Sequence, residues 1–268
     1  MRAIADMKPK HKMRKEIKMN ETPKVEPKMR DRKRAPIYQY YRDWCELVEL
    51  RKRHDNILRQ IKANKSNMDA HLEEIFLEEL QLDKWIDQYK KNMIAFSKLL
   101  APDIHNWLTS IGGIGDATAA KLIGELDDIA RFDTISKLWR FAGYAVIDGK
   151  REHYVKGQTA TYNKRLKSLV FMIGDEFIKH QTSPYIEIYY EEKKRQRELH
   201  PEKIKIDGKW KFNDGHLHYR AIDKMVKIFL SHVWLVWRQA EGLKISQPYS
   251  AQILGHSNII DPPGYSGE

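Results

Sequence analysis

The chain has 268 residues, and 41% of them are hydrophobic, so it is long enough and apolar enough to bury a core. Its formal net charge of +11 favours a polyanionic partner, and nucleic acid is the most common one. The single cysteine, Cys45, excludes an internal disulfide and a cysteine-rich zinc site, and it fits a reducing cytoplasm. The most apolar run, Met225 to Trp237, is too short and too polar to span a bilayer, and the start of the chain lacks the apolar core of a signal peptide. We therefore expect a cytoplasmic protein without a membrane partner.

Residues 1–35 are rich in lysine and arginine and have no apolar periodicity, which predicts a disordered basic arm. Such an arm either contacts nucleic acid non-specifically or only adds solubility. The rest of the chain is nearly neutral. Any further nucleic-acid surface must therefore come from local clustering of charge.

Residues 36–101 are predicted to form an antiparallel coiled-coil helical hairpin. Two seams of residues recur at steps of three and four, with Arg51 and His54 as polar members of the first. The reversal falls at "ANKSN", and Asn67 or Asp69 is expected to cap the second helix. The seam positions are Trp44, Leu47, Arg51, His54, Leu58 and Ile61, then Leu72, Ile75, Leu82, Trp85 or Ile86, Tyr89, Met93, Phe96 and Leu100.

A helical hairpin of this size has too little core to stand alone. It must pair with a second copy or dock on the rest of the chain, and we expect a homodimer through residues 37–100. The acidic run of this region, Glu73-Glu74 and Glu78-Glu79, is expected on solvated helix faces.

Residues 102–245 are predicted to form a compact, mostly helical domain, followed by an irregular tail over residues 246–268. Residues 145–162 lack a helical period and predict a loop or a short hairpin. Alternation around an Asp-Gly pair predicts a small β-hairpin near residues 204–212. The fold class is mainly α. The helices are expected near 103–111, 116–126, 134–142, 163–181, 184–199 and 216–241.

The stretch "SIGGIGDATAAKLIGEL" places three glycines within four residues between two predicted helices. It lacks the Gly-Lys-Ser/Thr of a phosphate-binding P-loop, and a helix rather than a strand precedes it, which excludes a dinucleotide fingerprint. The pattern has the form of a helix-hairpin-helix motif in which Ile111 and Ile114 fill the space between the helices. The alternative is a corner that binds nothing.

In a helix-hairpin-helix motif, the backbone approaches a phosphate chain and the amides at the second helix start point toward it. Asp116 is expected to cap that helix and to weaken phosphate binding there. The residues predicted to contact nucleic acid at this corner are Gly113, Ile114, Gly115 and Lys121.

A second basic group surrounds the loop before the predicted helix at 163–181. Tyr154 and Tyr162 lie among its cations and are suited to stacking on exposed bases. The alternative is a merely solvated charged loop. The predicted contact residues are Lys150, Arg151, Lys156, Lys164, Arg165 and Lys167.

Histidines offer a metal site as a further alternative, through His216-x-His218 with His232 or His200. Because no cysteine or convincing acidic partner accompanies them, we interpret the pair as a cap or a surface feature and expect no metal and no cofactor. The stripe Phe229, Val233, Trp234 and Trp237 has helical spacing and is predicted to lie in the core.

The segment Leu108 to Tyr144 resembles the start of the C-terminal transposase domain of the DEDD-type insertion-sequence transposases, the RNA-guided bridge recombinases. The shared features include Thr118-Ala119, Gly124-Glu125-Leu126, Arg131-Phe132 and Ala142-Gly143-Tyr144. Further on, "Asn163-Lys-Arg-Leu-Lys", Ser183-Pro184-Tyr185 with Tyr189 or Tyr190, and Arg220-Ala221 to Trp237 resemble later helices of that domain. The resemblance covers roughly residues 105–242.

The resemblance implies a coiled coil, here residues 37–100, and an N-terminal nuclease-like domain that residues 1–35 are too short to form. It also implies a serine nucleophile in the loop after the Ala-Gly-aromatic element, yet residues 145–162 contain no serine. Thr159 and Thr161 are more hindered nucleophiles, and Ser168 is interpreted as a packing residue of a helix. No catalytic residue is therefore assigned.

The function implied is binding of DNA, with structured RNA as the alternative ligand, in transposition or recombination, by a nucleoid-associated protein that does not cut on its own. The alternatives are an active compact recombinase and a coiled-coil scaffold protein.

Overall fold

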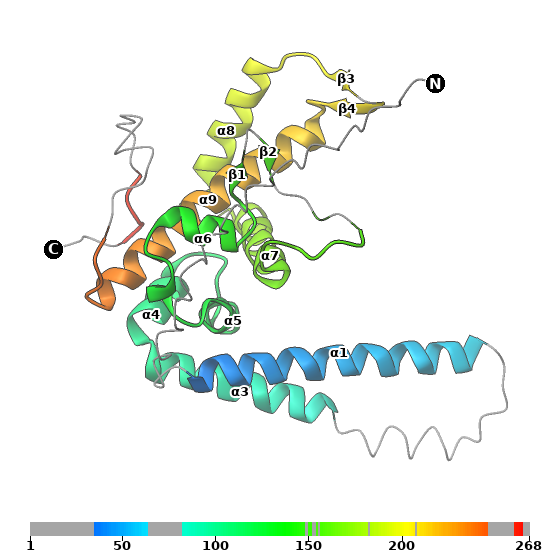
Figure 1. Cartoon of the computed structure of the whole chain (residues 1–268), viewed down its shortest axis with the longest axis vertical. Coiled ribbons are helices and arrows are strands. Elements are labelled where there is room, and N and C mark those ends of the chain that lie inside the picture. Colours follow the sequence, from blue (N-terminus) through cyan, green and yellow to red (C-terminus); the bar gives the residue numbers. More distant parts are fainter. Residues whose placement is uncertain are drawn as a thin grey trace, which may run out of the picture. The chain divides into compact units, whose positions relative to one another are not determined.

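A computed structural model gives the fold, and all the residues it describes belong to one compact unit, Asp31–Glu268. The chain is mainly α-helical, as predicted (Figure 1). Nearly all of the predicted basic arm, the reversal at "ANKSN", the acidic run and most of the C-terminal tail lie outside the described residues. The described residues are 35–63, 82–147, 150–151, 154, 156–181, 183–206, 208–245 and 260–264.

Helices α1 (Ala35–Ala63) and α3 (Leu82–Leu100) pack against each other in opposite directions (Figure 1). Near the start of α1, Tyr40 stacks on Phe96, with 5.3 Å between the ring centres. Farther along, the Nε of Arg51 donates to the carboxylate of Asp83 at 2.9 Å, which explains a polar residue on the predicted seam. Ile86 is half-buried while Trp85 is 53% exposed, so Ile86 takes the seam position.

The α1–α3 hairpin docks on α5 (Asp116–Leu126). Tyr41 of α1 is buried against Gly124 of α5, where no side chain keeps the two helices apart. Ile37 reaches the main core itself, and the buried Ala101 links the end of α3 to the helix that follows.

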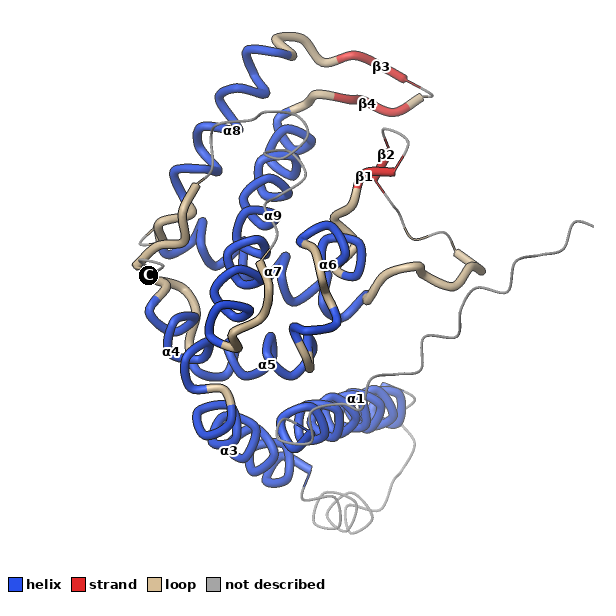
Figure 2. The backbone as a smooth tube through the Cα atoms, turned by 60° about the vertical axis from the view of Figure 1, so that its left-hand side comes forward, coloured by secondary structure: helices blue, strands red, loops and turns tan. Residues whose placement is uncertain are grey.

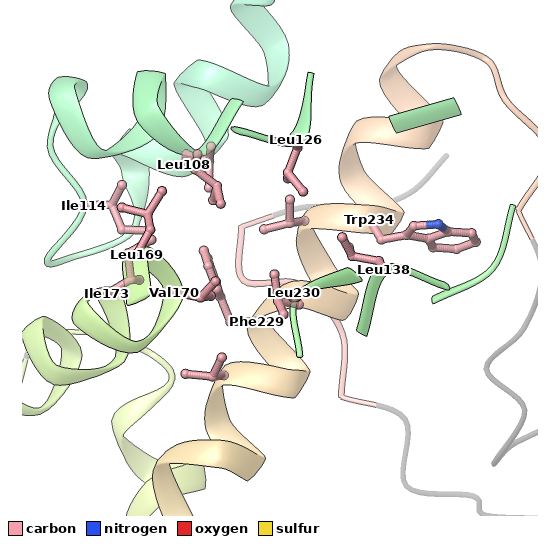
Figure 3. Packing of buried hydrophobic residues seen from close by; sticks show 14 of the residues in the cluster. Leu108, Ile114, Leu126, Leu138, Leu169, Val170, Ile173, Phe229, Leu230 and Trp234 are labelled. Atoms are coloured by element: carbon pink, nitrogen blue, oxygen red, sulfur yellow. The ribbon is translucent and has the colours of Figure 1, made fainter. Parts of the chain in front are cut away.

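The core of the unit forms around α9 (Asp214–Ala240), whose apolar face is buried along most of its length, as predicted for the stripe from Phe229 to Trp237. Figure 3 shows Phe229 and Leu230 of this helix on the side that faces Val170 and Leu108, with Leu138 and Trp234 toward the opposite side. The helices packed around α9 are α4 (Pro102–Ser110), the short 3-10 helix η1 (Ile129–Arg131), α6 (Ile135–Phe141), α7 (Lys164–His180) and α8 (Ile186–Leu199).

Polar side chains fix several helix starts by accepting hydrogen bonds from free backbone N–H groups. Thr134 does so for α6, Asn163 for α7 and Asn213 for α9. Pro102 begins α4, where its missing N–H costs no hydrogen bond. These positions agree with the predicted helices to within two residues.

Two antiparallel strand pairs form at the predicted places (Figure 2). β1 (Val146–Ile147) pairs with β2 (Lys150–Arg151), and β3 (Ile204–Ile206) pairs with β4 (Lys209–Lys211). Gly208, in the turn between β3 and β4, has φ +74°, a conformation that favours glycine. Both pairs lie toward the same end of the helical body in Figures 1 and 2.

A short C-terminal segment, residues 260–264, closes over the helices. The indole Nε1 of Trp107 in α4 donates to the carbonyl of Pro263 at 3.1 Å, and His232 Nε2 in α9 bonds to the carbonyl of Ile260 at 2.7 Å. Among the described residues, no helix has the length and apolar character that crossing a membrane requires.

Candidate nucleic-acid interface

The glycine corner is a tight turn between α4 and α5. Ile111 and Ile114 are buried, as the sequence pattern predicted, and they belong to the main core, where Ile114 lies beside Leu169 and Ile173 of α7 (Figure 3). Gly113 has φ +95°, and a Cβ atom there would lie 3.3 Å from Phe177 of α7, so both conformation and space favour glycine. Gly115 forms the N-cap of α5 and is exposed, with no atom within 4 Å of the place where a Cβ would lie.

Asp116 does not cap α5, contrary to the prediction, because Gly115 occupies the N-cap position. The Asp116 carboxylate instead accepts a hydrogen bond from Lys98 Nζ at 2.6 Å and lies 3.1 Å from His105 Nε2. The hydrogen bonds from Lys98 and then from His105 lower the pKa of Asp116. Buried Ser97 completes the chain through His105 Nδ1 at 2.7 Å, so α3, α4 and the start of α5 are joined by polar contacts.

Lys121 lies between α5 and the helical hairpin rather than at the glycine corner. Its Nζ is 4.1 Å from the ring centre of Trp44 in α1, a cation–π contact. Burial, followed by repulsion from Lys90, lowers the pKa of Lys121. The structure thus gives this lysine a packing role in docking the hairpin, and we leave it out of the proposed phosphate contacts.

The second basic group gathers at the start of α7. Lys164 is exposed and its Nζ lies 3.6 Å from the ring centre of Tyr154, which is itself 52% exposed. Lys167 Nζ lies 4.3 Å above the ring of Tyr162. Two lysines and two aromatic rings, drawn from the loop and from the first turn of the helix, therefore form one surface, and Arg165 is exposed beside them.

Close packing holds Tyr162 in place. Gly143 has φ +74°, and a Cβ atom there would lie 2.7 Å from the Tyr162 ring. Gly143, in the Ala142-Gly143-Tyr144 element of the resemblance, thus packs beneath both Tyr162 and Lys167.

For the other three predicted basic residues, the structure gives fewer side-chain contacts. Lys156 is exposed in the turn before α7, while Lys150 and Arg151 form β2, for which the structure describes the backbone.

Glu125 is the site residue to which sequence reasoning assigned no role. It is 5% exposed on α5, yet it lies directly beneath the basic surface. Asn163 Nδ2 donates to Glu125 Oε1, and Arg165 Nε lies 3.6 Å from Oε2. Tyr41 of α1 approaches from the other side, where burial and then the charge of Glu125 raise the tyrosine pKa.

Glu125 therefore connects the docked hairpin to the start of α7. The sequence contains a signal for a buried glutamate, because Glu125 lies close to Leu122 and Ile123 on the apolar side of the predicted helix. A buried carboxylate is costly unless it is paired, so its partners are fixed by the fold.

The loop between residues 145 and 162 contains no serine in the sequence, and Thr159 and Thr161 are exposed within it. Ser168 lies in α7, as predicted, but its side chain is exposed, so the interpretation of Ser168 as a packing residue is wrong. It occupies the solvent-facing side because Leu166, Leu169 and Val170 supply the buried side of that helix.

The histidines do not converge. His216 Nδ1 accepts the N–H of Phe212, His218 Nδ1 bonds to the Tyr189 hydroxyl, and His232 is buried in the core. Within the described part of the chain, no group of three or more potential metal ligands is found.

The structure is thus mainly helical and carries an aromatic and basic surface at the start of α7. Residues 105–191 match the family model described as Transposase IS116/IS110/IS902 family. The match includes the glycine corner, Glu125 and the start of α7, and it supports a role in transposition. No curated protein and no solved structure matches the chain.

Proposed function

We propose that this chain is a nucleic-acid-binding protein of the insertion-sequence transposase family that acts on DNA in transposition or recombination. The observation behind the proposal is the surface at the start of α7, where Lys164 contacts Tyr154, Lys167 contacts Tyr162 and Arg165 is exposed, within the residues that match the transposase model. Cations bind the phosphate backbone without reading sequence, and exposed rings stack on bases that are unpaired.

The glycine corner would add backbone contacts if it acts as a helix-hairpin-helix motif. Gly113 and Gly115 leave the turn free of bulky side chains, and Ile114 anchors it from below. Asp116 opposes an anion at this place, but Lys98 and His105 already engage its carboxylate. Because the Asp116 carboxylate still lies at the start of α5, we expect weaker phosphate contact here than at the start of α7.

We further propose that the chain does not cut nucleic acid on its own. The support is the loop of residues 145–162, which lacks a serine, and the hindered character of the two threonines there. Incubation of purified protein with supercoiled plasmid and divalent cations tests this. A nick or strand-transfer product that disappears in Thr159→Ala or Thr161→Ala would establish the alternative, an active compact recombinase.

Fluorescence anisotropy with duplex DNA at increasing salt tests the binding proposal. The variant Lys156→Gln/Lys164→Gln removes two exposed cations of the basic group, and its log–log salt slope should fall by about 1.8, or about 0.9 per lost phosphate contact. The control Lys52→Gln/Lys91→Gln makes the same change of charge on the hairpin, at lysines that are 62% and 68% exposed. Equal loss in both variants, or no binding by the parent protein, would contradict the proposal. A folded RNA hairpin in the same assay decides between DNA and structured RNA.

A further inference from the structure

The β3–β4 hairpin carries a concentrated positive charge that the proposed site does not include. Between Lys203 and Lys211 the sequence has four lysines and one acidic residue, Asp207. The hairpin lies outside residues 105–191, the part that matches the transposase model. It is therefore a separate candidate for binding.

The hairpin also displays a large aromatic side chain to solvent. Trp210 of β4 is 54% exposed. The strand register places Lys205 directly opposite Trp210, and their side chains share one face of the pair. Lys203 Nζ lies 5.0 Å and Lys205 Nζ 6.0 Å from the indole ring, so cations surround the ring and leave much of it open.

The base of the hairpin is held firmly against the helices. Phe212, which follows β4, has φ +57°, a strained conformation for a bulky residue. Its ring stacks on His200 with 3.7 Å between ring centres, and its N–H donates to His216 Nδ1 at 2.9 Å. These contacts hold the end of β4 two residues after Trp210.

The base is positively charged as well. The Arg220 guanidinium lies 5.6 Å from the Phe212 ring. Burial, and then the charges of Arg220, Lys211 and His200, lower the pKa of His216. An anion that approaches the hairpin therefore meets Lys211 of β4 and Arg220 in the first turns of α9.

We propose that the Trp210 face of the β3–β4 hairpin binds an unpaired nucleic-acid strand. The indole stacks on a base, and Lys203 and Lys205 contact the adjoining phosphates. The ligand is a single strand rather than a duplex because the flat faces of paired bases are covered by their neighbours, while those of an unpaired strand are open to an aromatic ring. The inference rests on the proposed function, which supplies nucleic acid as the ligand class, while the binding residues are those of the hairpin itself.

Three variants test the inference in fluorescence anisotropy with a labelled oligothymidylate of about 20 nucleotides, longer than the 4 to 16 that single-strand sites commonly cover. Trp210→Ala should weaken binding by roughly 5- to 150-fold, the range expected for loss of one stacked base. Trp210→Phe retains a ring and should recover most of the affinity. Trp85→Ala makes the same truncation at a tryptophan that is 53% exposed on α3, and it should leave affinity unchanged.

A charge variant supplies a second measurement. Lys203→Gln/Lys205→Gln should lower the single-strand salt slope by about 1.4, for two lost phosphate contacts. Duplex DNA of the same length serves as the comparison ligand, and its affinity should change little in Trp210→Ala.

Unchanged oligothymidylate affinity in Trp210→Ala, or an equal loss for single strand and duplex, would overturn the inference while leaving the proposed function standing. Failure of the parent protein to bind either ligand would overturn both. The variants should fold normally, because the Trp210 side chain is largely in solvent, and circular dichroism checks this directly.

Discussion

Gly124 of α5 lies against Tyr41 of α1 so closely that a Cβ atom on the glycine would be 2.8 Å from the Cβ of the tyrosine. Contact this close lets the α1–α3 hairpin dock on the rest of the unit through a few residues. A glycine inside a helix costs stability through backbone entropy, so its presence here is explained by the space that Tyr41 requires.

Replacing Gly124 with alanine should destabilise the protein by about 1–3 kcal/mol, because the tyrosine or the helix must shift. Urea denaturation measures the loss. Gly215→Ala is the matched control, since Gly215 lies in the first turn of α9 with only Asn213 Oδ1 near, at 3.7 Å. That control should be neutral or stabilise by about 0.5–1 kcal/mol. If both substitutions have the same effect, the close approach of Tyr41 is not what fixes the glycine.

Asn163 connects the start of α7 to buried Glu125, since it accepts hydrogen bonds from Arg165 N and Leu166 N while its amide donates to the glutamate. Asn163→Ala should cost about 1–2 kcal/mol for the cap, and more for the glutamate left without its donor. Asn163→Asp keeps the cap acceptor but sets two carboxylates together, so it should also destabilise.

Adding Glu125→Gln to Asn163→Asp should recover stability, because a glutamine amide can donate to the new carboxylate. Denaturation of the single and double variants forms the cycle that checks this. Additive losses in the double variant would show that the two residues do not act as a pair.

Acid should weaken the fold through three histidines whose pKa values the folded state lowers. Burial lowers the pKa of His232 below its usual 6.5, and it also lowers the pKa of His216 and of His218. The folded state therefore holds these imidazoles neutral, so their contribution to stability is complete above about pH 6.5 and is lost as the pH falls toward the lowered values.

Melting temperatures between about pH 8 and pH 5 measure the effect. His232 Nε2 donates to the Ile260 carbonyl, and its Nδ1 then accepts from Tyr185, so a glutamine can replace only part of this arrangement. His232→Gln should lower stability by about 1–2 kcal/mol at high pH and flatten the pH dependence. A pH profile as steep as that of the parent protein would assign the acid sensitivity to other groups.

A homodimer through the hairpin remains a prediction, supported by two exposed apolar side chains on α1. Leu50 is 36% exposed and Ile57 is 45% exposed, and they lie seven residues apart on one helix face. Light scattering should give twice the 31.7 kDa chain mass, and Leu50→Glu/Ile57→Glu should halve it while circular dichroism shows the helical fold unchanged. A parent protein that runs as a monomer would refute the dimer.

Local signals in the sequence predicted the helices well, because caps and periodicity act within a few residues. α5 begins and ends where the pattern placed it, and Ile111 and Ile114 are buried as expected. The choice between Trp85 and Ile86 could not be made, since both lie at the edge of the same seam. The partner helix decides it by covering only one of them.

Predictions about the site depended on residue type and were less complete. Lys121 looked like a phosphate contact because it follows the glycine corner, but the docked hairpin covers it with Trp44. Asp116 looked like a cap because aspartate often is one, yet the helix begins one residue earlier than that role requires. Lys121 and Asp116 each contact another helix, through Trp44 of α1 and Lys98 of α3, and local patterns do not encode such contacts.

The segment that matches the family model is shorter than the compact unit to which it belongs. Residues 105–191 end in α8, but the helix at the centre of the core is α9, which begins more than twenty residues later. Excised at the limits of the match, the piece would leave Leu108, Val170 and their neighbours without the surface they pack on. The stretch that matches the family model is therefore shorter than the unit whose core it helps to form.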